Sequence, residues 1–196
     1  MIKSLSDIKL VIWDLDETFW KGTLSERGGV IAPIAKNVEL VKDLTDRGIV
    51  NAICSKNDYE PAVMKLREFG VDEFFVFKSI DWTPKGQRVS KLIKDMGLRP
   101  VNCLFLDDNI VNLNEAQYYS KDLSIAEPSE IDNLIELCRQ AASTDLKHKR
   151  LNQYKVLEKK QKAKKKPVTI FNSFTLQTQY ARYIMTASLL LIGCSN

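Results

Sequence analysis

Two aspartates, Asp14 and Asp16, stand two positions apart directly after an apolar segment. The apolar run predicts a buried strand over residues 10–15. In an extended chain both carboxylates point to the same side, and the end of a strand is where open α/β sheets bind ligands. Like charges persist together where a cation lies between them or one is protonated. The pair indicates either a nucleophilic carboxylate beside an acid/base or a turn with two solvated aspartates.

A second acidic pair, Asp107 and Asp108, follows another short apolar segment. Two strands of one sheet that both end in carboxylates predict a Mg²⁺ site, because hard cations take oxygen ligands. Between the two pairs in the sequence lie Ser55, at the end of a third predicted strand, and Lys85, at the start of a predicted helix. Nucleophile, hydroxyl, lysine and acidic pair therefore follow one another in this order.

This order resembles the haloacid dehalogenase-like (HAD) phosphotransferase superfamily. The four motifs of that superfamily are matched by Asp14/Asp16/Thr18, Ser55, Lys85 and Asp107/Asp108. The resemblance covers residues 7–145 and implies an α/β fold, a Rossmann-like parallel sheet sandwiched by helices. It also implies a Mg²⁺-dependent phosphohydrolase or phosphotransferase that acts on a phosphorylated substrate.

The resemblance assigns a role to each matched residue. Asp14 would attack phosphorus in line and form an aspartyl-phosphate, while Asp16 would protonate the leaving oxygen and then deprotonate water. Ser55 would donate a hydrogen bond to the phosphoryl group, and Lys85 would stabilise charge on its oxygens. Thr18 would brace the loop through its hydroxyl.

The same resemblance implies the metal ligands. They would be Asp14, the backbone carbonyl of Asp16, and the acidic pair. Within the pair, Asp107 is expected to be the main ligand because it lies at the strand end, and Asp108 a direct or water-mediated one.

Three strings, over residues 16–23, 53–58 and 105–109, resemble the FkbH-like branch of subfamily IIIC. Members of that branch load a three-carbon (glyceryl-type) acyl unit from an acyl phosphate onto an acyl carrier protein. Cys54 would then be a candidate acyl relay; the alternative is a small apolar residue in a buried strand. A further alternative is a non-catalytic HAD module used for binding, which the complete set of motif carboxylates disfavours.

HAD enzymes that hydrolyse small molecules usually carry a cap domain, inserted after the first or the second motif. The spacing of the motifs in this chain leaves no room for one. The interval from Asp14 to Ser55 is filled by a loop and a helix, and the interval from Ser55 to Lys85 by a helix and a strand. Residues 20–30, which contain three glycines, predict a short β-hairpin flap. An open site suits an extended or carrier-protein-borne substrate; the alternative is that another domain supplies the lid.

Strand and helix patterns alternate, as in a parallel sheet covered by helices. Strands are expected over residues 10–15, 50–54, 74–77, 103–106 and 123–126. Helices are expected over residues 33–47, 59–69, 85–96, 111–119 and 129–139.

The net charge of +4 is unevenly distributed. Residues 147–166 hold ten Lys or Arg and one Glu, and residues 167–196 hold only Arg182. Residues 1–146 therefore carry 18 basic and 24 acidic residues, a net charge of −6. This pattern predicts a HAD-like catalytic domain over residues 1–145, a basic linker helix over 146–166 and a tail of uncertain structure over 167–196. Nucleic acid is an unlikely partner, because the basic segment has few aromatic residues and the preceding domain is acidic.

Four widely spaced cysteines without a CxxC motif indicate a reduced protein rather than a disulfide scaffold. The first residues lack the apolar core of a signal peptide, and the apolar stretch of residues 184–193 is too short to span a bilayer. We therefore expect a cytoplasmic protein without a membrane partner. A single histidine, His148, in a basic segment argues against histidine-dependent catalysis.

Overall fold

The computed structural model describes residues 4–25 and 31–165. Its main feature is a five-stranded sheet in the order β5-β4-β1-β6-β7, in which every neighbouring pair is parallel. The strands are β1 Leu10–Trp13, β4 Val50–Ser55, β5 Phe75–Ile80, β6 Cys103–Leu106 and β7 Ser124–Ala126. The three strands β4, β1 and β6, which carry the sequence motifs at their ends, are adjacent at the centre of this sheet.

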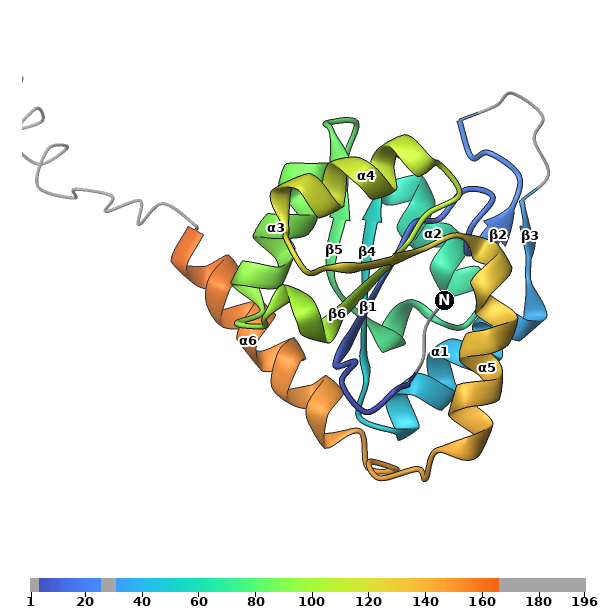
Figure 1. Ribbon diagram of the computed structural model, residues 1–196. Helices are drawn as coiled ribbons and strands as arrows, with labels where there is room; N and C mark the ends of the chain where they lie inside the picture. The colour runs from blue at the N-terminus through green and yellow to red at the C-terminus, as the bar shows by residue number, and fades with distance from the viewer. Residues whose placement is uncertain (1–3, 26–30, 166–196) are drawn as a thin grey trace, which may run out of the picture. The chain divides into compact units, whose positions relative to one another are not determined.

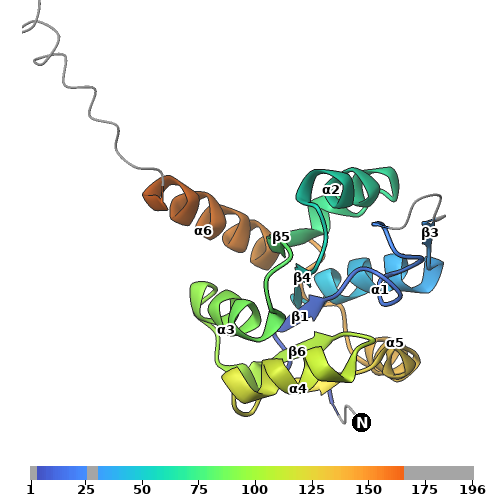
Figure 2. The same ribbon diagram turned by 90° about the horizontal axis from the view of Figure 1, so that it is seen from above.

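Helices cover both faces of the sheet (Figures 1 and 2). The α-helices are α1 Ala35–Asp46, α2 Tyr59–Glu68, α3 Lys85–Asp95, α4 Ile110–Tyr119, α5 Ile131–Gln140 and α6 Lys149–Lys165, and short 3₁₀ turns span Asp72–Phe74, Pro100–Asn102 and Pro128–Glu130. Side chains of α1, α2 and α5 belong to one apolar cluster, and side chains of α3 and α4 belong to another. The predicted three-layer α/β/α architecture is confirmed.

Strand β1 shows why the sheet has two covered faces. All four of its residues are buried, and they alternate: Val11 and Trp13 contribute to the cluster under α1, α2 and α5, whereas Leu10 and Ile12 contribute to the other. A period of two along a continuous apolar run is what a central parallel strand requires.

A small antiparallel pair, β2 Trp20–Lys21 with β3 Ala32–Pro33, follows the first motif. The two paired strands form the base of the predicted hairpin flap. Residues 26–30, which connect them, lie outside the described residues. In the described residues, the interval from β1 to β4 holds only this pair and α1, and the interval from β4 to α3 holds α2 and β5. These elements account for both intervals without a cap domain.

The beginning of α6 packs on the core. Leu151 is buried among the side chains of α3 and α4, and His148 Nε2 lies 2.8 Å from Asp46 Oδ1 at the end of α1. A compact unit extends as far as Gln161, and the predicted tail over residues 167–196 lies outside the described residues. The segmentation into catalytic domain, linker helix and tail stays a prediction. Among the helices described, none has the length and apolar character needed to cross a membrane.

Candidate active site

The carboxyl ends of the three central strands bring the sequence motifs together. Asp14 follows β1 and its backbone N–H still donates to Leu106 O of β6, at 2.9 Å. Asp107 follows β6, and Ser55 is the last residue of β4. Because β1 lies between β4 and β6, Asp14 stands between the predicted hydroxyl and the predicted acidic pair, as parallel pairing requires.

Lys85, the first residue of α3, joins the two motif aspartates. Its Nζ lies 2.7 Å from Asp14 Oδ1 and 2.7 Å from Asp107 Oδ2, and all three side chains are buried. A buried ammonium needs carboxylate partners, because an unpaired charge in the interior is costly. Although burial lowers the pKa of Lys85, the two carboxylates raise it above its ordinary value.

Three carboxylates form one acidic group, defined here as Asp14, Asp107 and Asp108. One oxygen from each lies within 4.8 Å of the others. Burial raises the pKa of Asp14 to about 6; Lys85 opposes this rise and the charge of Asp107 adds to it. Burial, and then the charge of Asp107, also raises the pKa of Asp108. Burial and the charge of Asp107 both disfavour the ionised forms of these carboxylates, and a cation would offset both effects.

The carboxylate of Asp107 is almost fully engaged by the protein. Oδ2 accepts from Lys85, and Oδ1 accepts from Asn109 N at 2.9 Å and from Asn112 Nδ2 at 3.0 Å. A carboxylate has about four lone-pair positions, so three accepted bonds leave about one for a cation. Asp108 is exposed and free to turn toward the same space.

Asp16 is turned toward the flap and is not part of the acidic group. Its Oδ1 accepts from the indole Nε1 of Trp20 at 2.8 Å and from Leu24 N at 3.3 Å. The expectation that Asp14 and Asp16 point to one side assumed an extended strand, but β1 ends at Trp13. The role of its backbone carbonyl as a metal ligand stays a prediction.

Ser55 is buried at the end of β4 and is held by two side chains that the sequence reasoning missed. Asn57 Nδ2 donates to its Oγ at 3.1 Å, and Arg88 Nη2 donates to its carbonyl at 2.9 Å. Arg88 also donates to Ser79 Oγ at 3.0 Å and to Thr83 O at 3.0 Å, so one guanidinium ties β4 to the loop that leads into α3. No motif indicates Arg88, because its role is defined by carbonyls far apart in the sequence.

The predicted role of the Thr18 hydroxyl is corrected by the structure. Thr18 is fully buried, and its Oγ1 has no hydrogen-bond partner among the described residues. Asn37 of α1 braces this loop instead, because its Nδ2 donates to Thr18 O at 3.0 Å and to Phe19 O at 3.1 Å. A bond from a helix side chain to a loop carbonyl leaves no local sequence pattern.

Cys54 lies in the apolar interior. Its side chain is fully buried in the cluster that contains Val76 and Phe105, and burial raises the pKa of its thiol to about 12. A thiol attacks as the thiolate, which this environment disfavours. The position therefore favours the interpretation of Cys54 as a small buried residue over that of an acyl relay.

No family model and no curated protein match this chain. Solved structures do. The N-terminal part of the protein BF1531 from Bacteroides fragilis, which contains a phosphatase domain complexed with Mg, superposes with a TM-score of 0.57 at 21% identity over 69% of this chain and 41% of that one. A protein from Vibrio cholerae, provisionally assigned as a 3-deoxy-D-manno-octulosonate 8-phosphate phosphatase, gives 0.53 at 15% identity over 71% of this chain and 89% of its own.

A hypothetical protein from Xanthomonas campestris gives 0.50 at 15% identity over 81% of this chain and 87% of its own. This chain covers only 41% of the Bacteroides fragilis structure. A phosphatase domain is among the similar structures. At these identities the likeness shows the fold: the chain has the Rossmann-like HAD fold.

Proposed function

We propose that the chain is a Mg²⁺-dependent HAD phosphohydrolase or phosphotransferase that forms an aspartyl-phosphate on Asp14. The observation that carries the proposal is the buried arrangement in which Lys85 contacts both Asp14 and Asp107 at 2.7 Å, with Asp108 beside them. The Mg complex of the phosphatase domain from Bacteroides fragilis supports the metal by fold analogy.

The residues present fit a hard cation. The acidic group offers only oxygen ligands, and Asp107 keeps about one lone-pair position. Burial, and then the charge of Asp107, raises the pKa of Asp14, and a cation would offset both effects. Asp14, Asp107, Asp108 and the carbonyl of Asp16 would hold the ion. Bound Mg²⁺ would neutralise phosphoryl oxygens.

Each of the proposed catalytic side chains has its own role in the reaction. An oxygen of Asp14 attacks phosphorus, the bond from phosphorus to the ester oxygen breaks, and Asp16 delivers a proton to that leaving oxygen. Asp16 next takes a proton from water, whose oxygen attacks the aspartyl-phosphate and releases phosphate and the free carboxylate of Asp14. Lys85 and Ser55 stabilise the phosphoryl oxygens, and Lys85 also keeps Asp14 ionised.

Hydrolysis of p-nitrophenyl phosphate with and without Mg²⁺ tests the proposal. Asp14→Asn should lower kcat by about 1,000-fold or more, since a nucleophile acts as a unit with its partners. The matched control is Asp43→Asn, at a half-exposed carboxylate of α1 outside the site. Wild-type activity in Asp14→Asn, or activity that does not change when Mg²⁺ is removed with EDTA, contradicts the proposal.

The finer hypothesis is FkbH-like transfer of a three-carbon acyl group to an acyl carrier protein. The absence of a cap between the described motif elements supports it, because an open site admits a carrier-borne substrate. Incubation with Mg²⁺, a three-carbon acyl phosphate and a carrier protein, followed by intact-protein mass spectrometry, tests it. Acylation that survives in Cys54→Ala would support transfer without the buried thiol. Phosphate release without acylation would leave a phosphohydrolase.

A further inference from the structure

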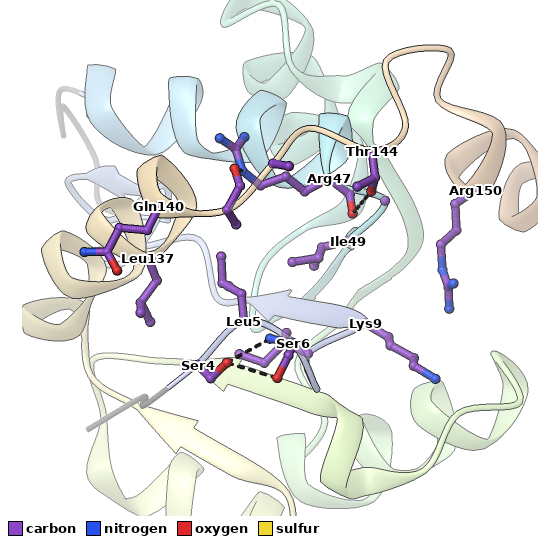
Figure 3. Close-up of a pocket in the computed structure, with 14 residues that line it drawn as sticks. Ser4, Leu5, Ser6, Lys9, Arg47, Ile49, Leu137, Gln140, Thr144 and Arg150 are labelled. Atoms are coloured by element: carbon purple, nitrogen blue, oxygen red, sulfur yellow. Dashed lines mark hydrogen bonds between the residues drawn. The ribbon is translucent and has the colours of Figure 1, made fainter.

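A pocket of about 620 Å³ lies at the amino-terminal edge of the sheet (Figure 3). Its wall is made by Ser4, Leu5, Ser6, Ile8 and Lys9, by residues 47–49 between α1 and β4, by parts of residues 137–144, and by Arg150 of α6. The volume falls within the range of about 300 to 1,000 Å³ that is typical of small-molecule sites.

This pocket is separate from the candidate active site. Lys9, in its wall, immediately precedes β1, whereas Asp14 immediately follows that strand. Five residues of extended chain, at about 3.3 Å each, put roughly 16 Å between the two positions. A ligand in this pocket would therefore not contact the acidic group.

The floor of the pocket is apolar. Leu5, Ile8 and Ile49 line it, and each is also part of the core cluster under α1, α2 and α5. Leu137 of α5 adds a half-buried side chain (Figure 3). An apolar floor that is fixed by the core can hold the apolar body of a ligand without rearrangement.

Charge in the wall is of one sign. The lining residues include Lys9, Arg47 and Arg150 and no Asp or Glu. Arg47 is engaged, since its Nε donates to Ala141 O at 3.2 Å and its Nη1 to Asp43 O at 2.8 Å. Lys9 and Arg150 make no ion pair with the described residues.

Both of these cations line the pocket. Figure 3 draws the side chains of Lys9 and Arg150 at one end of the pocket. The Nε of Arg150 is buried and has no hydrogen-bond partner among the described residues. A buried donor without an acceptor is rare and costly, so an anion at this point would supply what the protein lacks. Ser4 and Ser6 add hydroxyls to the wall.

We propose that this pocket binds a small molecule with an apolar body and one anionic group, either a carboxylate or a phosphate ester. Lys9 and Arg150 bind the anion by charge-assisted hydrogen bonds, and the floor of Leu5, Ile8 and Ile49 covers the apolar body. Such a molecule uses both features of the pocket, whereas inorganic phosphate would leave the floor uncovered.

Fluorescence titration with 8-anilinonaphthalene-1-sulfonate tests the proposal, because this probe joins an apolar body to one anionic group. N-phenyl-1-naphthylamine is the matched neutral probe. We expect one sulfonate site per chain in the wild type. The double variant Lys9→Gln/Arg150→Gln should raise the Kd of the sulfonate by about tenfold or more, as loss of charge-assisted bonds implies. The same variant should leave the Kd of the neutral probe within about twofold.

The control variant is Lys121→Gln/Arg139→Gln, which removes the same charges at exposed positions outside the pocket. An equal Kd for the sulfonate in both double variants and the wild type would overturn the proposal. Circular dichroism of all variants establishes that each is folded. Asp14→Asn should bind the probe like the wild type, because the pocket lies at the other edge.

Competition distinguishes the two sources of the anion. Sodium octanoate and octyl phosphate should each displace the sulfonate, and the tighter competitor identifies the preferred group. Inorganic phosphate should compete at least about tenfold more weakly, because it has no apolar body to bury. If neither octyl compound displaces the probe, or if inorganic phosphate competes equally well, the proposal is wrong.

Discussion

The charges at the two ends of the central strands differ in sign and in burial. We call these ends the carboxyl edge and the amino edge of the sheet. At the carboxyl edge, the acidic group and Lys85 are packed tightly, and Asp14, Asp107 and Lys85 are buried in mutual contact. At the amino edge, Lys9 is exposed and makes no ion pair with the described residues. The same sheet therefore carries buried charges in mutual contact at the carboxyl ends of its strands and an exposed charge at their amino ends.

The strongest test of this contrast is Lys85→Met. The variant leaves Asp14 and Asp107 buried without a cation, so we expect a loss of about 3–5 kcal/mol in the free energy of unfolding at pH 7. The loss should shrink toward pH 4, where Asp14 becomes protonated. Urea denaturation at both pH values measures it.

The matched control is Lys91→Met, six positions further along α3. Lys91 is 62% exposed and pairs with Asp95 at 2.8 Å, and such a pair contributes about 0.5 kcal/mol or less. Similar losses in the two variants would show that burial does not distinguish the edges.

The second test is Asp14→Asn in the absence of divalent metal. The pKa of Asp14 is raised from 3.8 to about 6 in the folded state. Between about pH 4 and pH 6 the folded state therefore keeps a proton on Asp14 that the unfolded state has already lost. The contribution of Asp14 to the stability of the wild type therefore falls as the pH rises through this window. At pH 7 the variant should be more stable by up to about 3 kcal/mol, the equivalent of the shift.

Thermal melts at pH 4 and pH 7, with EDTA present, measure the difference. Mg²⁺ should then stabilise the wild type and leave Asp14→Asn nearly unchanged, because the variant has lost a ligand. A variant that is less stable than the metal-free wild type at pH 7 would contradict the idea that charge is crowded at this edge.

The third test moves the helix that carries Lys85. A Cβ added at Gly86 would come within 2.6 Å of Glu115 Cγ and 2.8 Å of Glu115 O. Since the second atom belongs to the backbone of α4, Gly86→Ala must separate the two helices, and we expect a loss of about 1–3 kcal/mol in stability. Activity should fall as well, because Lys85 moves with α3.

Denaturation and p-nitrophenyl phosphate hydrolysis are the measurements for Gly86→Ala. Lys94→Ala, at an exposed position of the same helix, should leave both within experimental error of the wild type. Full activity in a destabilised Gly86→Ala would show that the position of Lys85 tolerates the helix shift.

The smallest effect is expected at the amino edge. Lys9→Gln removes an exposed cation that has no carboxylate partner among the described residues, so stability should change by no more than about 0.5 kcal/mol. Urea denaturation at low and high salt measures it. A loss comparable to that of Lys85→Met would remove the contrast between the edges.

The sequence allowed the fold and much of the site to be predicted. Strand β6 has the predicted bounds, residues 103–106, because a short apolar run stands between a 3₁₀ turn and two aspartates. Asp14, Asp107 and Asp108 come together because parallel strands end at one edge, and Lys85 joins them from the first residue of α3. This prediction rested on the order of the residues and on their resemblance to the HAD motifs.

Contacts that depend on side-chain direction could not be predicted. The turn of Asp16 toward Trp20 depends on where β1 stops, and sequence patterns locate element ends poorly. Asn112 and Arg88 stabilise Asp107 and Ser55 through bonds across many residues of sequence or between different elements. Polar side chains of this kind are also found on ordinary helix surfaces, so type alone does not single them out.

The hydrogen bond from Asp14 N to Leu106 O bears on the order in which the contacts of the site form during folding. The two aspartates that Lys85 joins are separated by 107 − 14 = 93 positions, and Asp107 N in turn donates to Ala126 O of β7. Contacts at such separation form late, because a long loop must close before they can be made. During synthesis, the first motif would leave the ribosome long before its partners. Lys85 and the acidic group therefore come together only after the chain has been made and folded as far as β7.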